Sequence, residues 1–179
     1  AAMIDYINKT QCSRIITIED PVEYVFKDHK SLITQREVGL DTLSFHVALK
    51  HVVREDPDII MIGEMRDHIS FSVALSAAET GHLVLSTLHT NDSASAFTRL
   101  LDMGIEPYLV SSAVIAVMAQ RLVRVICSRC KTESPLGPDA LAALSGRSDP
   151  AARVIYRGAG CEYCLSTGYR GRTGIFELL

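Results

Sequence analysis

Short β-branched runs alternate with helical stretches from Arg14 to about Val125, and this alternation constrains the fold more than any other feature of the chain. Such alternation is typical of a parallel sheet whose faces are covered by helices. Hydrophobic residues make up 47% of the 179 residues, so the chain is able to bury a sizeable core without disulfides or metal. The sequence therefore predicts an α/β domain with a mostly parallel sheet.

The expected elements follow from apolar periodicity and from turn residues. Strands are expected over residues 14–18, 59–62 and 83–88, with a hairpin or sheet extension between residues 22 and 39. Helices are expected over residues 1–8, from a cap at Asp41 or Thr42 to a point before Pro57, over 69–80, from a cap at residues 91–93 to Gly104, and from Pro107 to about residue 120.

Polar residues follow three successive expected strands. Glu19 and Asp20 end the first strand, Glu64 ends the second and His89 follows the third. Ligands of open parallel sheets gather at the carboxyl ends of the strands, where these side chains would meet. Two acids and a histidine there suit nucleoside triphosphate hydrolysis, which needs a ligand for Mg²⁺, a group that orients water and a group that senses the γ-phosphate.

The segment from Asp58 to Glu64 has the character of a Walker B strand, in which an apolar strand delivers an acid to a metal ion. The alternative is a buried strand followed by a solvated charged cluster over residues 64–67. Gly63 favours the first interpretation, because it permits close backbone approach directly before the acid.

Four segments carry motifs in a fixed order: ITIEDPVEY over residues 16–24, REDPD through GEMRD over 54–67, GHLVLSTLHTND over 81–92, and QRLVR over 120–124 before paired cysteines. They resemble the aspartate box, the atypical Walker B segment, the histidine box and the segment before the zinc knuckle of the type II secretion and type IV pilus assembly ATPases. The resemblance runs over essentially the whole chain.

This resemblance implies a RecA-like P-loop NTPase core that uses ATP and Mg²⁺ and carries a small zinc-binding module. It implies a cytoplasmic homo-hexamer that drives type II protein secretion or type IV pilus assembly. The implied partners are inner-membrane platform and assembly proteins, with no nucleic acid, so the protein would be peripheral to the inner membrane through its partners.

The family's site residues carry over onto matching positions of this chain. The resemblance implies that Glu19 aligns or activates water, that Glu64 binds Mg²⁺ and that His82 and His89 lie near the phosphates with Asp20, His89 being the better sensor. Which glutamate is the base stays open. Candidates for charge stabilisation in the transition state, across a subunit boundary or within one subunit, are Arg36, Arg54 and Arg66; each is equally explained as a solvated or salt-bridged surface residue.

The family also carries a phosphate-binding loop of the form G-x-x-x-x-G-K-[ST]. No Gly-Lys pair occurs in the 179 residues, and residues 1–8 look like the distal part of the helix that follows this loop. We therefore expect the loop to precede Ala1, and we expect this stretch of chain alone to bind ATP weakly and to turn it over negligibly.

Two C-x₂-C pairs, Cys127 with Cys130 and Cys161 with Cys164, supply the four thiolates of a closed structural zinc site. The spacer of 30 residues exceeds the usual zinc-ribbon range, which an intervening helix near residues 138–144 would explain. Disulfides are the alternative, although they suit oxidising compartments. The resemblance favours zinc, and it favours an assembly or secretion motor, because retraction motors generally lack this motif. Cys12 is expected to be a small buried residue.

The predicted domains are an ATPase core over residues 1–125, a tetracysteine module over 126–172 and the start of a further region over 173–179. The competing interpretations are a zinc-ribbon binding module for nucleic acid or protein, and a structural domain without hydrolysis. The net charge of −3 and the absence of Trp argue against the nucleic-acid alternative, which predicts a basic surface with exposed aromatic residues.

Overall fold

A computed structural model describes residues 1–135 and 154–179 of the chain. The chain divides into two compact units. The first comprises residues 1–119 and 177–179 and is called the sheet unit; the second comprises residues 120–176 and is called the cysteine unit. The domain boundaries predicted from the sequence stay a prediction.

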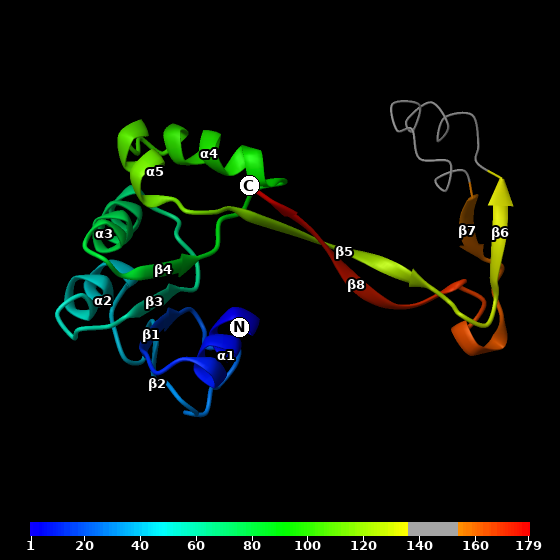
Figure 1. The fold of residues 1–179 in the computed structure, drawn as a ribbon, viewed down its shortest axis with the longest axis horizontal. Coiled ribbons are helices and arrows are strands. Elements are labelled where there is room, and N and C mark those ends of the chain that lie inside the picture. The colour runs from blue at the N-terminus through cyan, green and yellow to red at the C-terminus, as the bar shows by residue number, and fades with distance from the viewer. Residues whose placement is uncertain (136–153) are drawn as a thin grey trace. The chain divides into compact units, whose positions relative to one another are not determined.

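The sheet unit contains a four-stranded sheet in the order β2-β1-β3-β4, and every neighbouring pair of strands is parallel (Figure 1). The strands are β1 (Arg14–Glu19), β2 (Leu32–Glu37), β3 (Ile59–Ile62) and β4 (Leu83–Ser86). The helices are α1 (Ala2–Thr10), α2 (Phe45–Val52), α3 (His68–Glu79), α4 (Ser93–Asp102) and α5 (Pro107–Ala113). The predicted parallel α/β architecture is confirmed.

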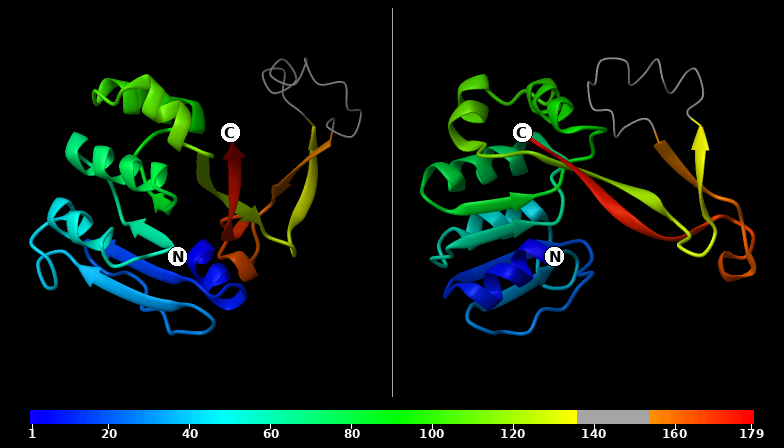
Figure 2. Two further views of the ribbon diagram at one scale, coloured as in Figure 1. Left: turned by 60° about the vertical axis from the view of Figure 1, so that its left-hand side comes forward. Right: turned by 45° about the vertical axis from the view of Figure 1, so that its right-hand side comes forward.

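The two faces of the sheet are covered by different helices, because successive side chains of a strand point to opposite faces. Ile16, Ile18, Ile60 and Ile62 pack with buried residues of α2 and α3 on one face. Ile15 and Ile59 pack with Ile4 of α1 on the other face, and Figure 2 shows α1 on the side of the sheet away from α2. A further apolar cluster joins the far side of α3 to α4 and α5. The central strands β1 and β3 are therefore buried on both faces, which explains their isoleucines.

The structure decides one open alternative for local structure and corrects two predictions. The segment between residues 22 and 39 is a sheet extension and not a hairpin, because β2 pairs with β1 in parallel. The cap of α2 is Ser44, whose Oγ accepts a hydrogen bond from the Val47 N–H at 3.2 Å, and neither Asp41 nor Thr42. The last helix ends at Ala113 and not near residue 120, since β-branched residues between Val114 and Val117 favour extended backbone.

Cys12 was predicted to be buried, and this is wrong. It is exposed, because it lies in the connection between α1 and β1.

The starts of α3 and α4 lie close to the predicted positions. Asp67 caps α3 and Asp92 caps α4, each through a side-chain oxygen that accepts from a backbone N–H three residues later. Gly81 and Gly104 follow α3 and α4 with positive φ, as helix stops commonly do.

The cysteine unit is built from short ribbons. β5 (Met118–Ile126) pairs with β8 (Tyr169–Leu178), and β6 (Lys131–Pro135) pairs antiparallel with β7 (Val154–Gly158). A single 3₁₀ turn, η2 (Glu162–Cys164), carries the second cysteine pair. The helix expected near residues 138–144 lies outside the described residues. No helix in the described part of the chain is long and apolar enough to cross a membrane.

Candidate active site and metal centre

Glu19, Glu64 and His89 come from the carboxyl ends of β1, β3 and β4, which are neighbours in the sheet. Gly63 brings the first two strand ends together: its N–H donates to the Ile18 carbonyl at 2.7 Å. A Cβ at position 63 would lie 3.3 Å from the Glu19 Cα, tighter than ordinary contact. The close backbone approach that the sequence indicated at Gly63 is therefore present.

Glu64 is the centre of a charged cluster. Its carboxylate pairs with the Arg66 guanidinium, and its Oε2 lies 3.1 Å from Nε2 of His89. The hydrogen bond from Arg66 chiefly, opposed by desolvation and assisted by His89, holds the pKa of Glu64 below its usual range. Glu64 in turn raises the pKa of Arg66, with a smaller contribution from the charge of Asp20. The cluster keeps Glu64 as an anion, the form that binds a metal cation.

Glu19 lies in a different environment, since it is only 6% exposed. Its Oε1 accepts two hydrogen bonds, from Thr17 Oγ1 at 2.7 Å and from Gln35 Nε2 at 3.0 Å. Neither donor was predicted from the sequence. The available signal was Thr17 itself, a polar residue inside an isoleucine-rich strand and on the same face as Glu19, two residues later.

Two of the predicted arginines lie away from the Glu64 cluster. Arg36 lies on β2 next to Gln35, so its side chain points to the opposite face of the sheet from Glu19. There it forms a salt bridge with Glu55 at 2.8 Å. Arg54 is exposed in the connection from α2 to β3, at the amino end of the strands. Within this one chain, neither arginine joins the Glu64 cluster.

His82 also lies away from His89. It precedes β4, so it is at the amino edge of the parallel sheet, whereas His89 is beyond the carboxyl edge. Its Nδ1 lies 2.9 Å from the Ala77 carbonyl and 3.2 Å from Thr80 Oγ1, at the end of α3. A polar hollow beside it is lined also by Gln11 and Asp58.

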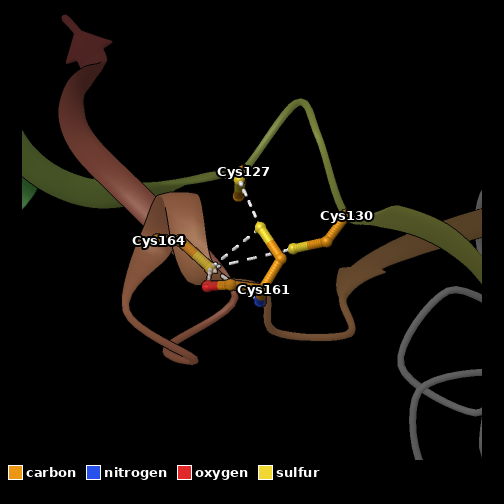
Figure 3. A group of neighbouring side chains, drawn as sticks. All are labelled: Cys127, Cys130, Cys161 and Cys164. Carbon is orange, nitrogen blue, oxygen red and sulfur yellow. Dashed lines mark hydrogen bonds between the residues drawn. The ribbon is translucent and has the colours of Figure 1, made fainter.

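The four paired cysteines form one cluster (Figure 3). Their sulfur atoms all lie within 4.8 Å of one another, and all four thiols are free of disulfides. The Sγ–Sγ distance is 3.9 Å for Cys127 to Cys161, 3.8 Å for Cys130 to Cys164 and 3.7 Å for Cys161 to Cys164. These two pairs, separated by 30 residues in the sequence, are able to hold one metal ion.

Two backbone N–H groups donate hydrogen bonds to one sulfur of this cluster, and such donors stabilise a thiolate. The N–H groups of Cys161 and Gly168 each donate to the Cys164 sulfur at 3.2 Å. Burial acts to raise the pKa of Cys164, but these donors and the neighbouring thiols outweigh it and lower that pKa to about 6. Burial chiefly, opposed by a backbone hydrogen bond from Gly160 and assisted by the thiol contacts, raises the pKa of Cys130 to about 12. The two backbone donors therefore stabilise negative charge on the Cys164 sulfur.

Comparison with known sequences gives one family. The profile described as "Type II/IV secretion system protein" matches residues 1–179. The chain is 48% identical over 166 residues to type II secretion system protein E of Pseudomonas aeruginosa, covering 92% of this chain and 32% of that protein. It is 48% identical over 164 residues to the type IV pilus assembly ATPase PilB of Thermus thermophilus, covering 91% of this chain and 18% of that protein. The chain thus spans less than a third of the length of these two relatives.

Comparison with solved structures also identifies motor ATPases. The pilus retraction motor PilT with bound ADP has 50% sequence identity and a TM-score of 0.67, over 71% of this chain and 39% of that chain. The ATPase DotB of Legionella pneumophila has 28% identity and a TM-score of 0.64, over 69% of this chain and 37% of that chain. The described fold is therefore the RecA-like fold of these motor ATPases.

Proposed function

The chain belongs to the type II/IV secretion system protein family, and on that premise we propose that the whole protein is an ATPase that powers type II protein secretion or type IV pilus assembly. It would act as a cytoplasmic hexamer against inner-membrane platform and assembly proteins. The tetracysteine cluster favours an assembly or secretion motor over a retraction motor.

One observation carries this proposal: Glu19 and the Glu64 cluster lie at the carboxyl ends of adjacent parallel strands. Nucleotides bind at this edge in open α/β sheets. Glu64, held as an anion beside Arg66 and His89, would hold Mg²⁺, which neutralises charge on the transferred phosphoryl group. Glu19, nearly buried on the neighbouring strand, would orient the attacking water.

Three of the predicted site residues lie away from the Glu64 cluster. His82, Arg36 and Arg54 belong to the amino edge or to the far face of the sheet, so they would serve a neighbouring subunit's site or none. Arg66, 71% exposed and bound to Glu64, is the arginine best placed to act within its own subunit.

The test uses the full-length protein. Glu64→Gln and Glu19→Gln should each lower single-turnover ATP hydrolysis on the order of 10²–10³-fold, because each removes one preorganised charge. ATP binding should be largely retained, since the phosphate-binding loop makes most triphosphate contacts. The matched control is Glu23→Gln, an exposed residue just beyond β1, which should cost far less. Rates within tenfold of wild type for both active-site variants would mean that the site is misplaced.

We further propose that the cysteine cluster binds zinc. Four sulfurs placed tetrahedrally at a zinc–sulfur distance of about 2.3 Å lie about 3.8 Å apart. Three of the six Sγ–Sγ separations, at 3.7, 3.8 and 3.9 Å, are close to this value, and all six are within 4.8 Å. Zinc would play a structural part here, closing two ribbon ends onto one ion.

A further inference from the structure

Gln35 lies beside the carboxylate that the proposed function assigns to water. In the parallel register of β1 and β2, Gln35 is the partner of Thr17, so both side chains lie on the face of the sheet that carries Glu19. Both donate to the same oxygen, Glu19 Oε1. Among the described residues, no hydrogen bond involves Glu19 Oε2. The two donors therefore fix the rotation of the carboxylate and determine which oxygen stays available.

The amide of Gln35 is itself held in place. Its Nε2 also donates to the Tyr24 carbonyl at 2.9 Å, and its Oε1 accepts from the Phe26 N–H at 2.8 Å. Tyr24 and Phe26 belong to the segment that connects β1 to β2, residues 20–31. A rotation of Gln35 away from Glu19 would therefore break contacts to this segment as well as to the carboxylate. A second amide, that of the buried residue Asn8 of α1, anchors the same segment through the Lys27 carbonyl at 2.8 Å and the His29 N–H at 3.0 Å.

Thr17 reinforces this arrangement from within β1. Its side chain is fully buried, and its hydroxyl hydrogen bonds to Glu19 at 2.7 Å. A buried hydroxyl needs a partner, and a carboxylate is the strongest acceptor available to it. The strand would bury an apolar residue more readily at this position, so the hydroxyl indicates a requirement set by Glu19.

We propose that Gln35 and Thr17 are positioning residues for ATP hydrolysis: they occupy Oε1 of Glu19 and so present Oε2 to the attacking water. This inference rests on the proposed function, because it requires Glu19 to act on water. It assigns no contact between either residue and the nucleotide. Their effect is therefore on turnover and not on ATP affinity.

The test compares matched variants of the full-length protein with Mg-ATP. Thr17→Val keeps the shape and removes the donor, and we expect single-turnover hydrolysis to fall about ten- to hundredfold, as for loss of a hydrogen bond to a charged group. Gln35→Ala should fall by a similar factor. ATP affinity should change less than about threefold in both, and Thr17→Ser should restore most of the rate because it keeps the hydroxyl.

Thr34→Val is the control, because Thr34 is the neighbour of Gln35 on the opposite face of β2. A double variant separates positioning from simple stability: Thr17→Val should add little to the loss caused by Glu19→Gln, since both act through one group. Full additivity, or Thr17→Val turnover equal to wild type beside an inactive Glu19→Gln, would overturn this inference alone. Near-normal hydrolysis by Glu19→Gln would instead overturn the proposed role of Glu19.

Discussion

The sheet unit and the cysteine unit are each stabilised internally, but by different interactions. In the sheet unit, fully buried isoleucines of β1 and β3 pack against α1 on one face and against α2 and α3 on the other. In the described part of the cysteine unit, the buried side chains are those of Cys127 and Cys164. Apolar burial therefore stabilises the first unit, whereas the second has little apolar core and depends on its sulfur cluster.

Metal removal tests this contrast most strongly. We expect a chelator, or Cys164→Ser, to remove about one zinc per chain and to unfold the cysteine unit, because structural zinc contributes about 10 kcal/mol or more to folding of such modules. Hydrogen exchange in the full-length protein should then show loss of protection over residues 120–135 and 154–176, with α2, β1 and β3 unchanged.

The matched control is Cys12→Ser, because Cys12 is exposed and lies outside the sulfur cluster. It should alter neither zinc content nor exchange. Elemental analysis that finds no metal in native protein, with the four clustered cysteines joined as disulfides, would contradict the zinc assignment.

A core substitution should produce the reverse pattern. Ile60 has no exposed surface, and Ile60→Ala should lower the free energy of unfolding of the sheet unit by about 2–5 kcal/mol through lost burial and a residual cavity. Zinc content should stay unchanged. Leu43→Ala, at a residue 87% exposed, should change stability by less than about 0.5 kcal/mol. Zinc loss on Ile60→Ala would show that the two units do not fold independently.

The sequence predicted the sheet unit well because its signals are local. β1 and β3 are short apolar runs, α3 and α4 are each bounded by an aspartate cap and a following glycine, and parallel strands bring their carboxyl ends to one edge. The sequence therefore predicts that Glu64 and His89 lie together, and the structure confirms this contact. Gln35 was missed, because its role depends on the register of β2 against β1, which no local pattern encodes.

The sequence was less informative where long-range pairing decides the structure. Val114 to Val117 allowed either helix or strand, and the end of α5 at Ala113 depends on the neighbouring ribbon, where Val117 and Leu179 exchange backbone hydrogen bonds of 2.9 and 3.0 Å. Net charge also averages over two unlike units: residues 120–176 contain nine Lys and Arg against four Asp and Glu. The overall charge of −3 therefore says little about a nucleic-acid partner for the cysteine unit.

A smaller effect within the sheet unit should come from the cap of α3. Asp67 accepts from the Ser70 N–H at 2.9 Å, and this bond chiefly lowers the pKa of Asp67. Asp67→Ala should lower stability by about 1 kcal/mol at neutral pH, whereas Asp67→Asn should retain most of the cap.

The pH dependence of this effect has a definite sign. A carboxyl whose pKa is lower in the folded state stabilises the fold above its unfolded pKa of about 3.9, and that stabilisation is lost as the pH falls through the folded pKa. The difference between wild type and Asp67→Ala should therefore shrink as the pH falls below about 5. Exchange of α3 amide groups, corrected for the intrinsic rate at each pH, measures it; a difference that grows on acidification would contradict this account.

The smallest expected effect comes from a cation–ring contact on the surface of the cysteine unit. Its removal tests whether such stacking, rather than the metal, stabilises this unit. The Arg124 guanidinium lies 3.9 Å from the centroid of the Tyr169 ring, and both residues belong to the β5–β8 ribbon that leads to the sulfur cluster. Because Arg124 is exposed, water competes for its charge, so the contact should contribute only about 0.5–1 kcal/mol. Arg124→Met retains an apolar stem over the ring and removes only the cation.

Arg172→Met is the control for this substitution, since Arg172 is exposed on β8 and stacks on no described ring. In zinc-loaded full-length protein, exchange protection of β5 should fall slightly for Arg124→Met and remain unchanged for Arg172→Met. A loss comparable to that caused by zinc removal would show that ring stacking stabilises this unit as much as the metal does, and the contrast with the sheet unit would then need a different explanation.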